Sequence, residues 1–186
     1  MGGYFAAIDC GTSTVKAGVF DACGRIRGLA ALECPSTYHP DGRIEQNGAL
    51  ILRQSLACLR EAVVQSKIKP AAFEGLSLAA QRATVIPVDR EGQPLTEAIS
   101  WQDLRGSRES GALRKIFPDR TFVKITGLPN NPVLSFAKIL WLKKHAPTLF
   151  RRTAKFLLVH DFLMKNLGSE DFISDWSNAS LTGLMD

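Results

Sequence analysis

The first part of the chain alternates between short apolar runs and turn residues. Residues 5–8 and 15–20 are apolar and flank a polar segment, and a third run follows at residues 25–34. Short apolar runs bounded by turn residues are typical of buried strands. Because the turns between them are short, the three runs predict an antiparallel three-strand meander.

Beyond the meander, the spacing of the apolar residues changes to that of a helix. Residues 47–66 begin at the N-cap candidate Asn47 and carry apolar residues three or four positions apart, whereas residues 36–46 predict a loop. Short apolar runs then return at residues 74–80, 84–88 and 98–101. We expect the first of these runs to be a buried strand. A strand, a helix and a further strand imply a right-handed crossover, so the expected fold class is α/β with a mixed sheet and flanking helices.

The second half of the chain favours helices. Three are expected, at residues 105–117, from Pro132 to His145, and at residues 160–167. The remaining stretches predict a turn at residues 126–129, a last strand at 172–175 and a turn at 177–180. At 186 residues, one domain with one sizeable core is the default expectation.

The polar segment between the first two strands has the composition of a phosphate-binding turn. Gly11 allows a tight reversal, and Thr12, Ser13 and Thr14 supply hydroxyl and backbone N–H groups around one small concavity. The Asp9 carboxylate would repel a phosphate unless a cation lay between them, which predicts Mg²⁺ at the end of this strand. The alternative is an ordinary hairpin in which Asp9 caps and Gly11 turns. The segment matches neither the G-x-x-x-x-G-K phosphate loop nor the dinucleotide-binding G-x-G-x-x-G.

Polar residues also follow two later strands. Gln81 and Arg82 come after the run at residues 74–80, and Trp101 and Asp103 end the run that begins at Ala98. In open α/β folds, ligands bind at the carboxyl ends of the strands. We therefore expect these side chains to gather with Asp9 along one edge of the sheet.

Composition and charge narrow the class of protein. The chain is 45% hydrophobic and 22% charged, with no apolar run of membrane-spanning length and no signal-peptide pattern at its start. Its four cysteines lack C-x-x-C spacing, so reduced thiols in the cytoplasm are expected. The net charge is +5, and basic residues cluster at positions 143–155 without the aromatic or glycine interleaving typical of nucleic-acid-binding patches. This pattern favours a solvated face or a protein partner, and predicts neither nucleic acid nor membrane as a partner.

Several short motifs occur in a fixed order along the whole chain. They are Ile8-Asp9-x-Gly11-Thr12-x-Thr14-x-Lys16, Gln81, Trp101-Gln102-Asp103-x-Arg105, Thr126-Gly127-Leu128, and Asp175-x-Ser177-Asn178-Ala179-Ser180-x-Thr182-Gly183-Leu184. Together they resemble the N-terminal domain of the FGGY carbohydrate kinases, which include glycerol, xylulose, ribulose, fucose and gluconate kinases. The resemblance implies a ribonuclease-H-like fold of the actin-like ATPase type, with ATP, Mg²⁺ and a small sugar or polyol bound between two lobes.

That resemblance also assigns roles to individual residues. It places the ATP phosphates at Asp9, Gly11, Thr12, Ser13, Thr14 and Lys16, with Mg²⁺ at Asp9. It places the sugar at Gln81, Arg82, Trp101, Asp103 and Arg105. The catalytic base, an aspartate, belongs to the second lobe in this family. Residues 1–186 would then be the N-terminal lobe alone, partnered by a C-terminal lobe of the same protein. The sequence stops at Asp186 without a tail, as expected of part of a longer chain, and we expect residues 1–186 alone to be inactive.

Four of the five candidate sugar residues also have a purely structural interpretation. Arg82 could form a surface salt bridge, and Trp101 could be core packing instead of a platform for a sugar ring. Asp103 and Arg105 could pair with each other or cap the following helix. His39, His145 and His160 show no pattern for a metal or a catalytic triad.

Two departures from the glycerol kinase pattern bear on the substrate. Ala83 stands where those enzymes carry a glutamate that binds polyol hydroxyls, and Val133 stands where they carry a tyrosine. Loss of a polar group from a pocket changes substrate choice strongly, so the resemblance disfavours glycerol and leaves the sugar open.

The sequence thus predicts a carbohydrate kinase that transfers phosphate from ATP to a hydroxyl group. The alternative is a nucleotide-driven switch or scaffold protein of the same fold, and a nucleic-acid binder would rest on the positive charge alone. The oligomeric state is open, with a homodimer as one candidate.

Overall fold

The three-strand meander forms as expected and is extended by one parallel strand. The computed structural model describes residues 2–186. In its largest sheet the strand order is β3-β2-β1-β6, with β2 antiparallel to both neighbours and β6 parallel to β1. The strands are β1 (Tyr4–Cys10), β2 (Thr14–Asp21), β3 (Ile26–Glu33) and β6 (Phe73–Ala80). The mixed sheet and the helical crossover from the meander to β6 are therefore confirmed.

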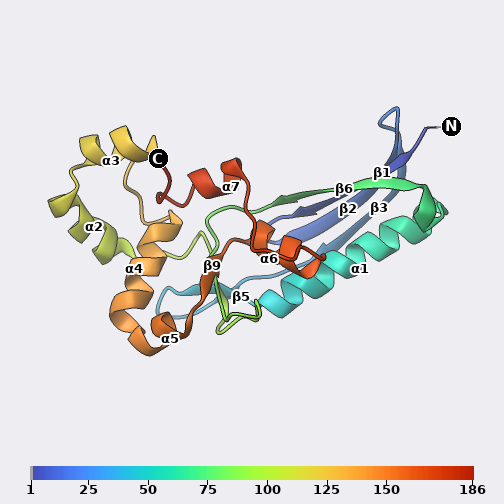
Figure 1. Ribbon diagram of the computed structural model, residues 1–186. Coiled ribbons are helices and arrows are strands. Elements are labelled where there is room, and N and C mark those ends of the chain that lie inside the picture. Colours follow the sequence, from blue (N-terminus) through green and yellow to red (C-terminus); the bar gives the residue numbers. More distant parts are fainter. Residues whose placement is uncertain (1) are drawn as a thin grey trace. The chain divides into compact units, whose positions relative to one another are not determined.

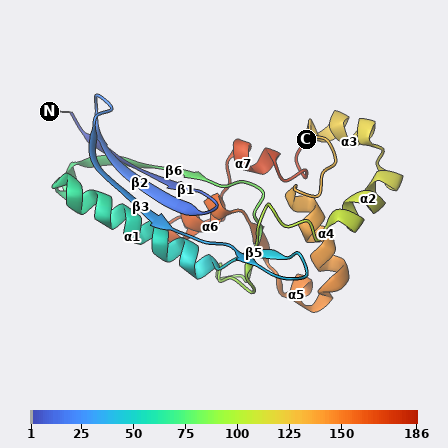
Figure 2. The ribbon, with the colours of Figure 1, turned by 180° about the vertical axis from the view of Figure 1, so that it is seen from behind.

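The crossover between the meander and β6 is helix α1 (Gly48–Ser66), followed by a short 3-10 turn, η1 (Pro70–Ala72). Figures 1 and 2 show α1 lying along one face of this sheet. Ile8 and Val15 from the strands and Cys58 from the helix are fully buried. Gly28 of β3 permits the close approach, because a β-carbon there would overlap the carbonyl oxygen of Ala62 in α1.

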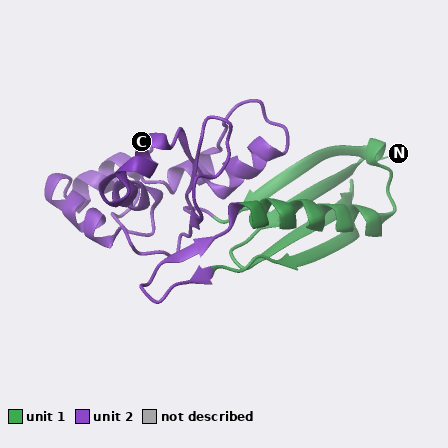
Figure 3. Ribbon diagram, turned by 90° about the horizontal axis from the view of Figure 1, so that it is seen from below, with its two compact units in different colours: residues 1–36, 49–81 green, residues 37–48, 82–186 purple. Residues whose placement is uncertain are grey.

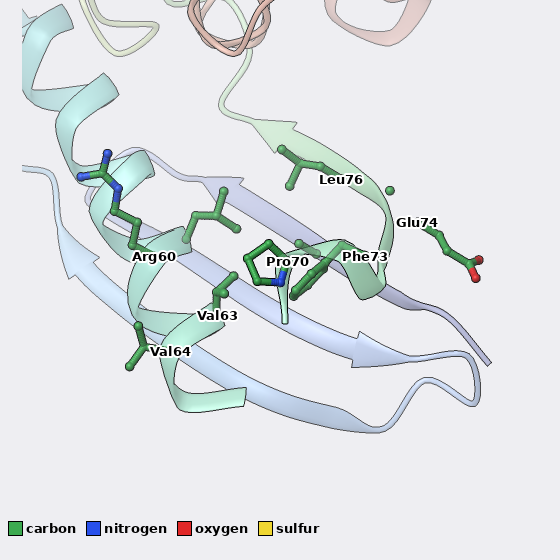
Figure 4. A pocket seen from close by; sticks show the side chains of 10 residues that line it. Arg60, Val63, Val64, Pro70, Phe73, Glu74 and Leu76 are labelled. Atoms are coloured by element: carbon green, nitrogen blue, oxygen red, sulfur yellow. The ribbon is translucent and has the colours of Figure 1, made fainter. Parts of the chain in front are cut away.

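Strand β6 differs from the sequence prediction in its burial. Its apolar composition predicts a buried strand, yet most of its residues are exposed, and Leu76 keeps 44% of its surface. The reason is its position at the edge of the sheet, where nothing among residues 2–186 pairs with its outer side. A largely apolar groove of about 710 Å³ runs between α1 and β6 (Figure 4), lined by Val63, Val64 and Phe73 among others.

The chain divides into two units, which Figure 3 shows in different colours. The first unit contains residues 2–36 and 49–81, and therefore the large sheet and α1. The second contains residues 37–48 and 82–186. The expectation of one domain, which rests on the length of the chain, stays a prediction.

The second unit combines two small sheets with six helices. Its strands are β4 (Thr37–Tyr38), β5 (Ile44–Gln46) and β8 (Ala98–Ile99) in one sheet, and β7 (Ile86–Val88) and β9 (Lys155–Leu157) in the other. Its helices are α2 (Ser107–Ile116), α3 (Asp119–Thr126), α4 (Ser135–His145), α5 (Pro147–Arg152), α6 (Val159–Asn166) and α7 (Trp176–Ser180). Phe122, Leu134, Phe136 and Ala137 form an apolar cluster between α3 and the start of α4.

Three local predictions were wrong, and two helices of this unit were missed. Residues 36–46 contain β4 and β5 instead of a loop, because β5 pairs with the distant β8. Residues 172–175 form no strand, and residues 177–180 lie in α7 instead of a turn. Helices α3 and α5 were not predicted, although Pro118 and Gly127 bracket the first and Pro147 opens the second. No helix of residues 2–186 is long and apolar enough to span a membrane.

The close packing of β3 on α1 gives a stability test. Gly28→Ala should lower the free energy of unfolding by about 1–3 kcal/mol, because its new methyl group meets backbone that a rotamer change cannot move. Gly111→Ala in α2 is the matched control. It has nothing within 4 Å and should be neutral or stabilising by about 0.5–1 kcal/mol. Urea unfolding curves of the two variants measure the difference, and equal destabilisation would contradict the packing argument.

Candidate functional site

The predicted phosphate turn connects β1 to β2 in the first unit. The Gly11 N–H donates to the Thr14 carbonyl over 3.0 Å, and a β-carbon at Gly11 would lie 2.9 Å from the same oxygen. The Cys34 N–H donates to the Ser13 carbonyl over 2.9 Å and so fixes the turn to the end of β3. The turn is therefore tight and held from both sides.

Register places two charged candidates of this turn on one face of the sheet. Asp9 of β1 lies directly opposite Lys16 of β2, and both side chains are exposed. Their neighbours Cys10 and Val15 point to the opposite face and are fully buried. Since residues opposite each other in an antiparallel pair share a face, Lys16 points to the same side as Asp9.

The donor set at this turn suits Mg²⁺ bound together with a phosphate. Within residues 2–186, no hydrogen bond or ion pair engages the Asp9 carboxylate, and no group of three or more His, Cys, Asp or Glu side chains is placed to hold a metal ion. Mg²⁺ keeps several waters and is commonly held by one or two carboxylates plus substrate phosphates. One exposed carboxylate beside a turn of hydroxyl residues fits that mode and does not fit an all-protein metal cage.

Gln81 lies against the phosphate turn. Its N–H donates to the Cys10 carbonyl over 2.8 Å, and its side-chain amide reaches the Gly11 carbonyl at 3.4 Å. The resemblance implied a sugar-binding role for Gln81. These two contacts connect it to the turn at Gly11 within the same unit, and its sugar-binding role stays a prediction.

The other four sugar candidates belong to the second unit. Arg82 is exposed, and its guanidinium reaches the Ser177 carbonyl at 3.5 Å. No carboxylate of residues 2–186 pairs with it, so the surface salt bridge left open by the sequence is not formed. The next residue, Ala83, is fully buried with a φ of 62°, a left-handed conformation that is uncommon for any residue other than glycine.

Trp101 is partly available to a ligand. Trp101 is 36% exposed, and its backbone N–H donates to the Thr84 hydroxyl over 3.1 Å. This hydrogen bond connects the turn at residues 100–103, here called the Trp101 turn, to the segment that follows Arg82. Core packing and a sugar-facing platform are therefore both compatible with its position.

Asp103 and Arg105 form the salt bridge that the sequence left open as an alternative. Asp103 has no exposed surface, and its Oδ2 lies 2.6 Å from the Arg105 Nη2. Arg105 also binds Glu45 of β5 at 2.7 Å and lies 5.1 Å above the ring of Trp141 in α4. The Ile44 N–H donates to Asp103 over 2.7 Å. This buried cluster connects β5, α4 and the Trp101 turn.

The pKa of Asp103 reflects two opposed effects. Burial by itself raises it, and the hydrogen bonds donated by Arg105 and by the Ile44 N–H outweigh burial, so the pKa lies below its usual value. The carboxyl group is therefore ionised at neutral pH, with each of its oxygens accepting two hydrogen bonds.

Three polar residues around these candidates were not found from the sequence. Glu45 lies in the stretch predicted to be a loop. The opposite charge of nearby Arg43 was the one sequence feature that could have indicated an ion-pairing role for Glu45. Thr84 and Lys138 carry no spacing signal. Their contacts become visible only in the fold, since Thr84 meets Trp101 and Lys138 bonds to backbone carbonyls at the start of α4.

Comparison with known proteins identifies the family. Residues 4–186 match the N-terminal domain of the FGGY family of carbohydrate kinases. The chain belongs to this family, and the resemblance seen in its motifs is confirmed. The α/β fold of the actin-like ATPase type is confirmed with it.

Individual relatives support this placement. The chain is 36% identical to a glycerol kinase of Rhizobium meliloti (strain 1021) over an alignment of 188 positions, which covers 98% of this chain and 38% of the relative. A Plasmodium falciparum glycerol kinase with ADP matches at a TM-score of 0.88 and 26% identity, over 98% of this chain and 38% of that one. A xylulose kinase from Rhodospirillum rubrum shares the fold at a TM-score of 0.89 and 22% identity, over 98% and 37%. The chain thus spans well under half the length of these proteins.

The buried pair predicts a large difference between two equivalent substitutions. Asp103→Asn should lower the free energy of unfolding by about 1.5–3 kcal/mol at pH 7, because it weakens the charge-assisted hydrogen bonds from Arg105 and leaves Glu45 as the remaining carboxylate partner of Arg105. The control Asp119→Asn removes the partner of Arg114 from an exposed ion pair. It should change the free energy of unfolding by less than about 1 kcal/mol.

The same pair predicts a pH dependence with a definite sign. Because folding lowers the pKa of Asp103, its ionised form stabilises the protein above the unfolded pKa of about 4, and this contribution is lost as the pH falls further. The difference between wild type and Asp103→Asn should therefore shrink below about pH 4. Urea unfolding at pH 3 to 7 measures it, and a difference that stays constant would contradict the assignment.

Proposed function

We propose that the full-length protein transfers the γ-phosphoryl group of ATP to a hydroxyl group of a small sugar or polyol. In this proposal residues 1–186 form the N-terminal lobe, and a C-terminal lobe of the same protein supplies the catalytic base. The observation that carries the proposal is the family match over residues 4–186, combined with the exposed Asp9 carboxylate beside a tight hydroxyl-rich turn.

Asp9 and the residues around it are assigned to the phosphates. Backbone N–H and hydroxyl groups of Gly11, Thr12, Ser13 and Thr14 would bind phosphate oxygens, and Gln81 supports the turn from the side of β6. Lys16 adds positive charge on the face that carries Asp9. Bound Mg²⁺, held through Asp9, would neutralise charge on the phosphates.

Arg82 and Trp101 are assigned to direct sugar contact, because both have exposed surface and no carboxylate of residues 2–186 pairs with Arg82. A planar donor group and an aromatic ring are suited to sugar hydroxyls and to the apolar face of a sugar ring, respectively. The four hydrogen bonds to Asp103 leave its oxygens occupied, so we assign Asp103 and Arg105 to holding the Trp101 turn.

The substrate is narrowed to a class. Glycerol and xylulose kinases are among the relatives and structural neighbours, so a polyol or a five-carbon ketose heads the candidates. Ala83 and Val133 offer no polar side chain to a hydroxyl group, which disfavours glycerol by the loss of a buried hydrogen-bonding partner. We place the reaction in the cytoplasm, a proposal supported by four cysteines that are all free thiols.

A coupled ADP-release assay on the full-length protein tests the proposal with glycerol, D-xylulose, D-ribulose, L-fuculose and D-gluconate. At least one should give Mg²⁺-dependent turnover. Asp9→Asn should reduce it by about 10²-fold or more, since it removes the charge that holds the metal. The control Glu61→Gln, an exposed carboxylate of α1, should keep wild-type activity.

The alternative function gives a different result in the same experiment. A nucleotide-driven switch of this fold would bind ATP by calorimetry but show no sugar-dependent turnover with any of the five. That outcome would replace the kinase proposal.

A further inference from the structure

The first turns of helix α4 contain a fully buried cation. Lys138 has no exposed surface, and its ammonium donates to the carbonyls of Val133 at 2.7 Å and Pro132 at 3.3 Å. Within residues 2–186, no carboxylate lies within ion-pair distance of it. Burial of a charge without a paired counter-charge is strongly unfavourable, so the burial of the Lys138 ammonium needs a physical explanation.

The location of Lys138 adds to this penalty. It lies near the N-terminal end of α4, where the helix dipole disfavours a positive charge. Two charged groups reach it from the segment between β8 and α2. Asp103 attracts the ammonium and Arg105 repels it, and these two largely neutralise each other in their own salt bridge. The hydrogen bonds to the two carbonyls are therefore the main favourable contacts of the ammonium.

The same end of α4 holds the chain next to Arg82. The Ser135 hydroxyl lies 3.5 Å from the carbonyl oxygen of Ala83, the buried residue with a φ of 62°. A residue in that conformation keeps it only when its surroundings enforce it. The start of α4 thus contacts two segments, residues 132–133 through Lys138 and residue 83 through Ser135, and Arg82 directly precedes the second.

We propose that Lys138 is a positioning residue of the sugar pocket, whose buried ammonium fixes the Pro132–Val133 backbone and with it the first turn of α4 against the segment that carries Arg82. The proposal rests on the proposed function for its substrate. It assigns Lys138 no contact with substrate or nucleotide. The physical basis of this role is that a charged ammonium forms stronger hydrogen bonds to the two carbonyls than a neutral amine does.

This role is sensitive to pH. Burial lowers the pKa of Lys138 to about 8, with Asp103 opposing the shift and Arg105 adding to it. Above that pH the side chain becomes a neutral amine and its hold on the two carbonyls weakens. The sugar site should loosen in the same range, while the phosphate turn in the first unit contains none of these groups.

The test uses the full-length protein and whichever sugar of the five-member panel gives turnover. KM for the sugar and for ATP, and kcat, are measured from pH 6.5 to 9.5 for wild type, Lys138→Arg and Lys138→Met. The controls are Lys143→Arg and Lys143→Met, which change an exposed lysine of the same helix.

We expect the wild-type sugar KM to rise by about tenfold across pH 8, with the ATP KM unchanged. Lys138→Arg should remove this rise, because a guanidinium remains charged throughout the range. Lys138→Met should have the higher sugar KM at every pH, and both Lys143 variants should follow wild type. A sugar KM that shows the same pH dependence in wild type and both Lys138 variants would overturn the proposal.

A second measurement does not depend on turnover. Amide hydrogen exchange at Leu134, whose N–H donates to the Asn131 carbonyl over 3.0 Å, reports the same turn. It should accelerate by about tenfold or more in Lys138→Met relative to Lys143→Met at pH 7. If no sugar gives turnover, the proposed function fails while this comparison still decides whether Lys138 fixes the turn. Equal exchange in the two variants would refute that role.

Discussion

The geometry of the second unit depends on one carboxylate that is sealed from water. Asp103 accepts hydrogen bonds from the backbone at the start of β5, from the backbone after the Trp101 turn and from the guanidinium of Arg105. Arg105 in turn reaches Glu45 and the face of Trp141. Each charge in this cluster is tolerated in the interior because its neighbours compensate it. The cluster therefore behaves as a unit, and it anchors the turn at residues 100–103 that contains Trp101.

The elements that sequence reasoning predicted are those whose signals are local. The meander and α1 carry strong periodicity over many residues, and the turn at Gly11 has its own residue chemistry. Strands β4 and β5 have two and three residues, too few for any periodic signal, and β5 exists because it pairs with β8 more than fifty positions away. The exposure of β6 has a similar cause. The apolar composition of β6 predicts a buried strand. Its actual burial depends on neighbouring elements that the local sequence does not specify.

The candidate site divides in the same way. The turn at Gly11 could be predicted because one short segment contains it, and the structure added the direction of Lys16 through strand register. The phosphate role of its residues stays a prediction. The roles within the second unit needed long-range contacts. The sequence could place Asp103 near a pocket or in a salt bridge, and only the fold showed its four donors and complete burial. Lys138 gave no signal at all, since a lysine in a helix is ordinarily a surface residue.

The exposed outer side of β6 has a practical consequence for handling residues 1–186 in isolation. A strand at the edge of a sheet presents unpaired backbone groups, and here they lie beside a largely apolar groove with Leu76 and Val64 at the surface. Such a surface promotes self-association at the concentrations used for crystallisation or NMR. Solubility screens on residues 1–186 should therefore begin with polar substitutions along that edge, leaving the turn at Gly11 untouched.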